Sequence, residues 1–429
     1  MTIFGILWLC IVLWDFVKKP VTNTVFLTIL FMTFQSTNIL YVNGTGIGPG
    51  VLTSIVCILK IFFIQKFKIR KILLSTTTFV TAFLVLFVVY ISMMLNGIFV
   101  ENTLLFFQIA VYIVCFTSIQ FIRTTITADL VYQSVRKIII FHTIFGIIQI
   151  LTTINFLPLH SILNTLFYND PSTDILFHRA YYARVMSTFM EPSYYAGFLV
   201  GAFFFLLIQK DKLFQNKILV YVIAIEILLT QSSTAYGAFL IVAIVLILFF
   251  DNFTLKQKLT ICVAGIAAGF VLYVGFYSLL DAVIFSKNLS GSYTTRVRYN
   301  NTALEAFLTS PLIGVGYKNC RGSSIVYSLL GQMGIMGMGI YILFNTLVYF
   351  TKEIGFNHTN DLLAASKFGV LTTMVCQIIA CPDLDLCTYW IWLYIFSLVI
   401  RIMSQNVRDS RDGTQQLLPE SLINSANNK

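Results

Sequence analysis

Charge is scarce in this sequence. Asp, Glu, Lys and Arg make up 11% of the 429 residues, whereas hydrophobic residues make up 58%. A water-soluble domain could not bury so much apolar surface, so the composition excludes an ordinary soluble globular protein. Apolar runs of roughly 20 residues recur along the chain, and each is long enough to cross a bilayer. We therefore expect an all-α polytopic membrane protein, because backbone polar groups inside a bilayer must be paired within helices.

Metal-binding spacings are also absent. The eight cysteines are scattered, mostly within apolar runs, and no Cys-x-x-Cys or Cys/His pair occurs. We therefore expect no metal centre and no cofactor. Cys381 and Cys387 flank one expected outer loop and could form a disulfide. We expect no cleavable signal peptide, since the first apolar run lacks a basic start and a small-residue cleavage site.

The net charge of +10 does not indicate nucleic-acid binding. Most Lys and Arg residues lie in short segments between apolar runs, and such segments mark the cytoplasmic side of a membrane protein. The segment KFKIRK at 66–71 sets the orientation. Alternation of the spans then places the N-terminus outside and the C-terminal tail inside. Membrane lipids, and no nucleic acid, are the expected surroundings of the chain.

Hydropathy divides the chain into about 12–13 transmembrane helices and two larger outer loops. One predicted span covers 20–42 and another covers 259–280. The polar tail after Met403 is expected to be disordered. The predicted regions are an N-terminal transmembrane bundle (1–156), a first outer loop (157–191), central transmembrane helices (192–280), a second outer loop with an interfacial helix (281–322), C-terminal transmembrane helices (323–403) and a disordered cytoplasmic tail (404–429).

Residues 218–250 test this division. They are apolar except for Glu226 and the QSST stretch at 231–234. A single helix here would be about 50 Å long, which is too long for one crossing. We expect two helices that meet at this polar turn, whose side chains, Ser232 and Ser233 among them, should face an outward-open cavity.

Apart from Lys60, which lies within a span, seven basic residues break the inside bias, and all of them fall in the two outer loops. Two interpretations are open. The residues could be solvated or snorkelling surface charges, or the two loops could converge on an anion at the outer membrane surface, a role for which arginine is well suited. The seven residues are Arg179, Arg184, Lys287, Arg296, Arg298, Lys318 and Arg321.

The second outer loop contains a predicted helix, capped by Thr294 or Thr295, that ends before a proline. Its apolar residues share one side, so it should lie along the membrane surface. Arg296 and Arg298 are about 200° apart on a helix. Both can reach one ligand only if the helix begins after them or the ligand is large. Glu305 shares a helix face with Arg298 and is its expected partner.

The turn that follows the helix contains Gly314 and Gly316. Glycine allows a positive φ or a close approach of the backbone. Such a turn could present N–H groups to an oxygen anion, although a plain turn is the alternative.

Two carboxylates stand out from their apolar surroundings. Glu191 precedes Pro192 at the start of a span, where it could cap the helix, serve as an acid/base group or orient Arg184. Glu226 lies within a span. A carboxylate there is either functional or paired with a buried Ser or Tyr hydroxyl.

Several motifs occur in order between residues 175 and 340. They are R-x(4)-R, F-x-E-P-S, S-S-T-A-x-G, R-x-R-x(4)-A-L-E-A-F-x(3)-P-L-I-G-V-G-Y and L-x-x-x-G-x-M-G. In combination they resemble the bacterial O-antigen polymerase family, a branch of the O-antigen ligase and polymerase superfamily. The resemblance implies that repeat units carried on undecaprenyl diphosphate are joined into a polysaccharide on the periplasmic face of the inner membrane. It also implies a GT-C-like fold, no nucleotide sugar, no metal and a partner protein that regulates chain length.

The resemblance also implies roles for individual residues. Glu191, Arg184 and Arg298 would be catalytic, with the arginines stabilising the diphosphate leaving group and Glu191 acting as the base. We expect Arg184→Ala and Arg298→Ala each to abolish long chains. Substrate binding would fall to Arg179, Arg296, Gly314, Gly316, Tyr317, Ser232 and Ser233.

Other functions stay open at this stage. Ligases of the superfamily often carry a His near the start of the span after the Gly-x-Gly turn, and residues 321–330 (RGSSIVYSLL) contain none. This favours a polymerase over a ligase. A flippase of lipid-linked oligosaccharides would place its cations in a central cavity, whereas here they lie in outer loops. A bulk-transport channel is a further alternative.

Overall fold

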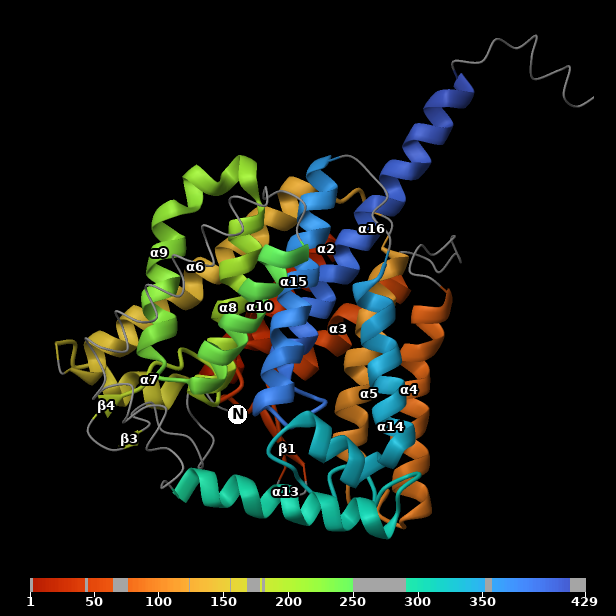
Figure 1. Ribbon diagram of the computed structural model, residues 1–429. Helices are drawn as coiled ribbons and strands as arrows, with labels where there is room; N and C mark the ends of the chain where they lie inside the picture. The colour runs from red at the N-terminus through yellow and green to blue at the C-terminus, as the bar shows by residue number, and fades with distance from the viewer. Residues whose placement is uncertain are drawn as a thin grey trace, which may run out of the picture.

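The computed structural model describes residues 3–42, 45–64, 76–122, 124–154, 156–167, 178–179, 182–249, 291–351 and 357–416. Helices dominate these residues, and only two short antiparallel hairpins interrupt them (Figure 1). The hairpins pair β1 (Leu40–Val42) with β2 (Thr45–Ile47), and β3 (His178–Arg179) with β4 (Tyr182–Ala183). The all-α architecture predicted from composition is confirmed.

Five described helices are long and apolar enough to cross a membrane, which supports a multi-pass membrane protein. Several shorter helices complete the bundle. The five are α4 (Thr76–Leu95), α5 (Thr103–Ser118), α6 (Ala128–Thr153), α14 (Ile325–Tyr349) and α15 (Asn357–Ile379). The others are α1 (Ile3–Lys18), α2 (Val21–Met32), α3 (Pro49–Ile64), α7 (His160–Phe167), α8 (Pro192–Ile208), α9 (Leu213–Leu229), α10 (Ser233–Phe249), α13 (Gly291–Thr309), α16 (Cys387–Gln416) and the short 3-10 helices η1 (Ile119–Phe121) and η2 (Lys210–Lys212).

Some predicted boundaries are confirmed and others are wrong. Residues 218–250 form two helices, as expected, because α9 ends at Leu229 and α10 begins at Ser233. The span predicted over 20–42 is shorter, since α2 ends at Met32 and β1 follows. The tail is not disordered from residue 404, because α16 continues to Gln416. The predicted span 259–280, the segment 66–71 and Lys287 lie outside the described residues.

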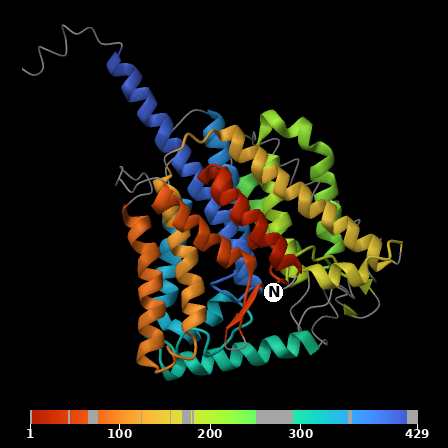
Figure 2. The ribbon, with the colours of Figure 1, turned by 180° about the vertical axis from the view of Figure 1, so that it is seen from behind.

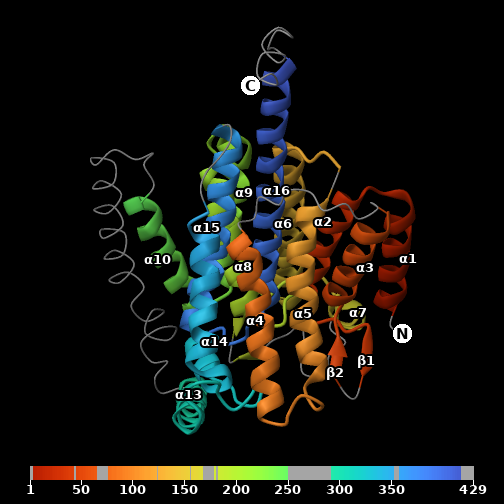
Figure 3. The same ribbon diagram turned by 90° about the vertical axis from the view of Figure 1, so that its right-hand side faces the viewer.

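The described parts of the second outer loop (291–322) and of the C-terminal tail (404–416) lie at opposite ends of the bundle (Figure 1). Helix α13 crosses one end of the bundle, and α16 projects beyond the other (Figures 1 and 2). Figure 3 shows α13 nearly end-on, beneath α14 and to one side of the lower end of α4. The opposite placement agrees with the predicted topology, in which the loop is outer and the tail is inner.

Helix α13 begins earlier than expected, at Gly291, and ends at Thr309 as predicted. Tyr293, Val297 and Leu308 are 45%, 39% and 67% exposed and share one stripe of the helix. An exposed apolar stripe on a helix that crosses the end of a bundle is the pattern of an interfacial helix.

The centre of the bundle is held by close packing around one tryptophan. Helices α8 and α16 both pack on α15, and Trp392 of α16 is fully buried there. A Cβ atom at Gly201 of α8 would lie 2.7 Å from the indole ring of Trp392, and one at Gly369 of α15 would lie 2.2 Å from it. Small residues therefore let three helices close on a large ring, as is common between membrane helices.

Gly369→Ala should lower the free energy of unfolding by about 1–3 kcal/mol, because the added methyl overlaps the indole ring. Gly339→Ala on α14 is the matched control, since a Cβ atom there meets nothing within 4 Å. Its effect should be below about 0.5 kcal/mol or slightly stabilising, because alanine favours helix. Thermal unfolding of the purified protein in detergent measures both, and equal effects would contradict this packing.

Candidate functional site

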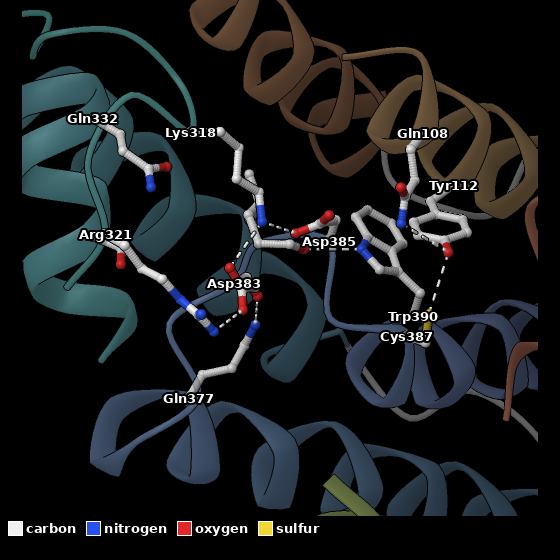
Figure 4. A network of polar contacts seen from close by, with 12 residues as sticks. Gln108, Tyr112, Lys318, Arg321, Gln332, Gln377, Asp383, Asp385, Cys387 and Trp390 are labelled. Atoms are coloured by element: carbon white, nitrogen blue, oxygen red, sulfur yellow. Dashed lines mark hydrogen bonds and ion pairs between the residues drawn. The ribbon is translucent and has the colours of Figure 1, made fainter. Parts of the chain in front are cut away.

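Four charged side chains form an ionic cluster at the end of the bundle near α13 (Figure 4). Lys318 Nζ lies 2.8 Å from Asp383 Oδ1 and 2.7 Å from Asp385 Oδ1. Arg321 Nη2 lies 3.0 Å from Asp383 Oδ2. The cations come from the second outer loop and the carboxylates from the loop between α15 and α16. The ionic cluster (Lys318, Arg321, Asp383, Asp385) therefore ties these two segments together.

The loop that carries the two carboxylates is held by hydrogen bonds from buried side chains. Gln377 Nε2 donates to the backbone carbonyl of Asp383 at 2.9 Å, and Trp390 Nε1 donates to that of Leu384 at 3.0 Å. Tyr341 in turn donates its hydroxyl to Gln377 Oε1 at 2.8 Å. The carboxylates of the cluster therefore project from a fixed backbone.

Lys318 has an unusual backbone conformation for a residue with a side chain. Its φ is 65°, in the left-handed region. Ser187 and Gln231 also have positive φ, at 50° and 48°. Such conformations cost free energy and gather at functional sites. The three residues belong to the three segments that the sequence selected: the end of the first outer loop, the QSST turn and the second outer loop.

Lys318, Arg321 and Asp383 stay ionised because the opposite charges around them stabilise their charged forms. Burial acts to lower the pKa of Lys318, but Asp385, Tyr317 and Asp383 together raise it well above its usual value. Burial acts to raise the pKa of Asp383, but Lys318 and Arg321 hold it below its usual value. Burial also opposes the charge of Arg321, while Asp383 leads the groups that raise its pKa.

Glu191 lies close to this cluster. It occupies the N-cap position of α8, as predicted, but its side chain makes no capping hydrogen bond. The exposed carboxylate accepts a hydrogen bond from the Ser193 hydroxyl at 3.0 Å. Its charge is among those that raise the pKa of Arg321. The carboxylate is therefore available at the surface beside a cation.

Arg296 of α13 also acts electrostatically on the α15–α16 loop. Burial raises the pKa of the Cys381 thiol, Glu191 and Asp383 raise it further, and Arg296 opposes them. All three charged groups thus act on one thiol in the α15–α16 loop. Glu191 and Arg296 therefore lie within electrostatic reach of this loop, so charged residues from both predicted outer loops act on it.

A buried, non-helical segment delivers Glu191 to this position. Met186 and Ser187 are fully buried, and their N–H groups donate to Gln149 Oε1 at 3.0 and 2.8 Å. Ser36 donates its hydroxyl to the carbonyl of Phe189 at 2.9 Å. Side chains of α6 and of the segment after α2 thus satisfy backbone groups that have no helix to pair them.

Arg184 has a different place from the one expected. Its Nε donates to the carbonyl of Thr230 at 2.9 Å and its Nη2 to that of Gln231 at 3.1 Å. These carbonyls lie just after α9, where helical hydrogen bonding ends, so Arg184 caps that helix. It joins the first outer loop to the QSST turn.

The serines of the turn have local roles. Ser232 is 2% exposed, and its hydroxyl accepts a hydrogen bond from the N–H of Ala235 at 3.4 Å, which places it as the cap of α10. Ser233 is the first residue of α10 and is half-buried. The buried carboxylate nearby, Glu226, accepts the Tyr195 hydroxyl at 2.8 Å. The hydroxyl partner considered for Glu226 is therefore present.

Arg298 does not join Arg296. The helix begins before both residues, so they point to different sides of α13, and Arg298 is exposed while Arg296 is half-buried. No ion pair joins Arg298 to Glu305 among the described residues, so this expected partnership is wrong. Arg179 lies in β3, and its side chain is outside the described part of the chain.

The Gly-x-Gly turn packs against a kink instead of facing an anion. The N–H groups of Gly314, Val315 and Gly316 donate to the carbonyls of Ser310, Gly331 and Gln332 at 2.9, 2.9 and 3.0 Å. Helix α14 kinks at Gly334 beside this turn. A Cβ atom at Gly314 would lie 2.3 Å from the backbone of Gln332. The expectation that this turn offers N–H groups to an oxyanion is therefore wrong.

Tyr317 is fully buried behind Lys318, so it supports the cluster and is not on the surface. Cys381 and Cys387 are both free, so the disulfide considered from the sequence is not formed. No three His, Cys, Asp or Glu side chains gather to hold a metal ion in the described part of the chain.

Sequence reasoning missed Asp383 and Asp385. The signal was available, because CPDLDLC at 381–387 places two acids in a short loop between apolar helices. Comparison with known proteins adds nothing to this assignment: no family model and no curated protein matches the chain.

Arg184→Ala should lower the free energy of unfolding by about 1.5–3 kcal/mol, because two charge-assisted hydrogen bonds to backbone carbonyls are lost. Arg298→Ala is the control: its exposed side chain makes no ion pair among the described residues, and it should change stability by less than about 0.5 kcal/mol. Thermal unfolding compares the two. Equal losses would show that Arg184 does not cap α9.

The ionic cluster should contribute constant stability across neutral pH. The lowered pKa of Asp383 gives stability that is present above its unfolded pKa and is lost as pH falls through its folded pKa. The raised pKa of Lys318 gives stability that is lost only as pH rises through its folded pKa, above about 10.4. The stability difference between wild type and Asp383→Asn should therefore be flat from about pH 5 to 9 and shrink below about pH 4. A difference that titrates near pH 7 would contradict this charge assignment.

Proposed function

We propose that the protein is a GT-C-type membrane glycosyltransferase that polymerises lipid-linked oligosaccharides. It would join repeat units carried on undecaprenyl diphosphate into a surface polysaccharide, as O-antigen polymerases do, on the periplasmic face of the bacterial inner membrane. The observation that carries the proposal is the meeting of Glu191, Arg296 and Arg321 at one end of an apolar helical bundle.

Both arginines, Arg296 and Arg321, have N–H donors that the described residues leave free to bind an anion. A guanidinium has five N–H groups, and Arg321 uses one contact, to Asp383, while its side chain is 51% exposed. Arg296 is half-buried and makes no hydrogen bond or ion pair with the described residues. Guanidinium groups bind phosphate oxygens bidentately, so these two arginines could hold the diphosphate of a lipid-linked donor.

The chemistry assigns each group a role. The bond between the anomeric carbon of the donor sugar and the diphosphate oxygen breaks, and its electron pair stays on the diphosphate. Arg296 and Arg321 stabilise this developing charge. The acceptor hydroxyl forms the new bond to the anomeric carbon, and its proton passes to the exposed Glu191 carboxylate. Arg184 acts indirectly, by fixing the turn after α9.

The interfacial helix α13 fits this reaction. Its exposed apolar stripe would lie at the membrane surface, where the diphosphate of a polyprenyl lipid would also be found. Arg296 lies on the side of α13 that faces the α15–α16 loop. The helix therefore brings a cation to the level of the lipid headgroup.

Arg296→Gln and Arg321→Gln should each abolish long polysaccharide chains, while the exposed Arg298→Gln on the same helix leaves the ladder intact. A lipopolysaccharide gel from complemented deletion strains measures this, with immunoblots to confirm equal membrane insertion. Loss of a polymerase leaves core with a single repeat, loss of a ligase leaves bare core with lipid-linked polymer, and loss of a flippase leaves neither. Normal ladders from both variants would contradict the proposal.

A further inference from the structure

Asp383 is the centre of the ionic cluster. Its Oδ1 pairs with Lys318 at 2.8 Å and its Oδ2 with Arg321 at 3.0 Å, and Tyr194 donates its hydroxyl to Oδ2 at 3.4 Å. Asp385 pairs with Lys318 alone, at 2.7 Å. Asp383 is therefore the carboxylate that occupies Arg321, the exposed cation of the proposed site (Figure 4).

The charges of the site already balance before any ligand arrives. Three cations (Arg296, Lys318, Arg321) and three carboxylates (Glu191, Asp383, Asp385) give no formal net charge. A diphosphate adds further negative charge beside Asp383. The diphosphate must either share Arg321 with the Asp383 carboxylate or displace that carboxylate from Arg321. Like charges that lie close together repel strongly in a partly buried site.

We propose that Asp383 is a resident counter-anion that competes with the lipid diphosphate for Arg321 and so limits how tightly the site holds it. The inference rests on the proposed function, because a polymerase must release polyprenyl diphosphate after each transfer. An arginine pair without a competing carboxylate would retain that product, and product release limits turnover in many enzymes.

Asp383 would not touch the reacting atoms. It is a positioning residue that acts through Arg321, and the braced α15–α16 loop keeps it in place when the ligand leaves. This role predicts the direction in which the anion affinity changes, and a purely structural role would not give that direction. Removing the carboxylate charge should tighten anion binding while slowing polymerisation.

Binding of inorganic pyrophosphate to the purified full-length protein in nanodiscs, measured by calorimetry, tests this. Asp383→Asn should lower Kd about 10-fold, which corresponds to about 1.4 kcal/mol. Asp385→Asn is the matched control: it removes a carboxylate from Lys318 but leaves Arg321 paired, and it should change Kd less than about 3-fold. Arg321→Gln in the Asp383→Asn background should return Kd to the wild-type value or above it.

The polymerisation assay supplies a second readout. The Asp383→Asn variant should form polymer more slowly than wild type. Pyrophosphate should inhibit this variant at a concentration about 10-fold lower than the one that inhibits wild type. Asp383→Ser, which is also uncharged, serves the same tests if the asparagine variant does not fold.

The results distinguish a failure of the counter-anion role from a failure of the proposed anion site. Unchanged or weaker pyrophosphate binding by folded Asp383 variants, with wild-type binding that depends on Arg321, would overturn the counter-anion role alone. Wild-type protein that does not bind pyrophosphate, or binds it independently of Arg296 and Arg321, would overturn the anion site of the proposed function and this inference with it.

Discussion

The Lys318–Asp383–Arg321 interaction is the constraint on which the end of the bundle near α13 depends. It joins the second outer loop to the loop between α15 and α16, two segments that are distant in the sequence. Ion pairs that are taken partly out of water contribute little net stability, but removing one partner leaves the other charge unpaired, which is costly. The pairs therefore fix where the loop can lie, and this placement brings Arg296 and Arg321 near Glu191.

The same end of the molecule shows how irregular backbone can be kept beside a membrane. The segment before Glu191 is buried without being helical, and Gln149 and Ser36 satisfy its backbone groups. The turn after α9 is satisfied by Arg184. Irregular backbone is tolerated at such depth only when protein groups replace the missing helical bonds. These side chains hold in place two segments that each contain a residue with positive φ, Ser187 and Gln231.

Much of the fold followed from the sequence, and less of the site did. The break at 231–234 was predictable because polar residues interrupt an apolar run too long for one crossing. The end of α13 was predictable from Pro311.

The sequence could not show that Arg184 caps α9, because that contact joins residues far apart in the chain. Nor could the sequence show that the Gly314 N–H donates to a backbone carbonyl of the protein. A glycine turn that binds an anion and one that packs on a kinked helix have the same Gly-x-Gly sequence pattern. Asp383 escaped notice because acids in a short loop usually face solvent.

Arg296 and Arg321, cations from separate segments, are proposed to hold the diphosphate of a lipid-linked donor. An experimental structure of the full chain in nanodiscs with bound undecaprenyl diphosphate tests it most directly. The account predicts phosphate oxygens within hydrogen-bonding distance of Arg296 and Arg321, with the lipid tail leaving along α13 toward the membrane. A diphosphate bound at the opposite end of the bundle, or held without either arginine, would contradict it.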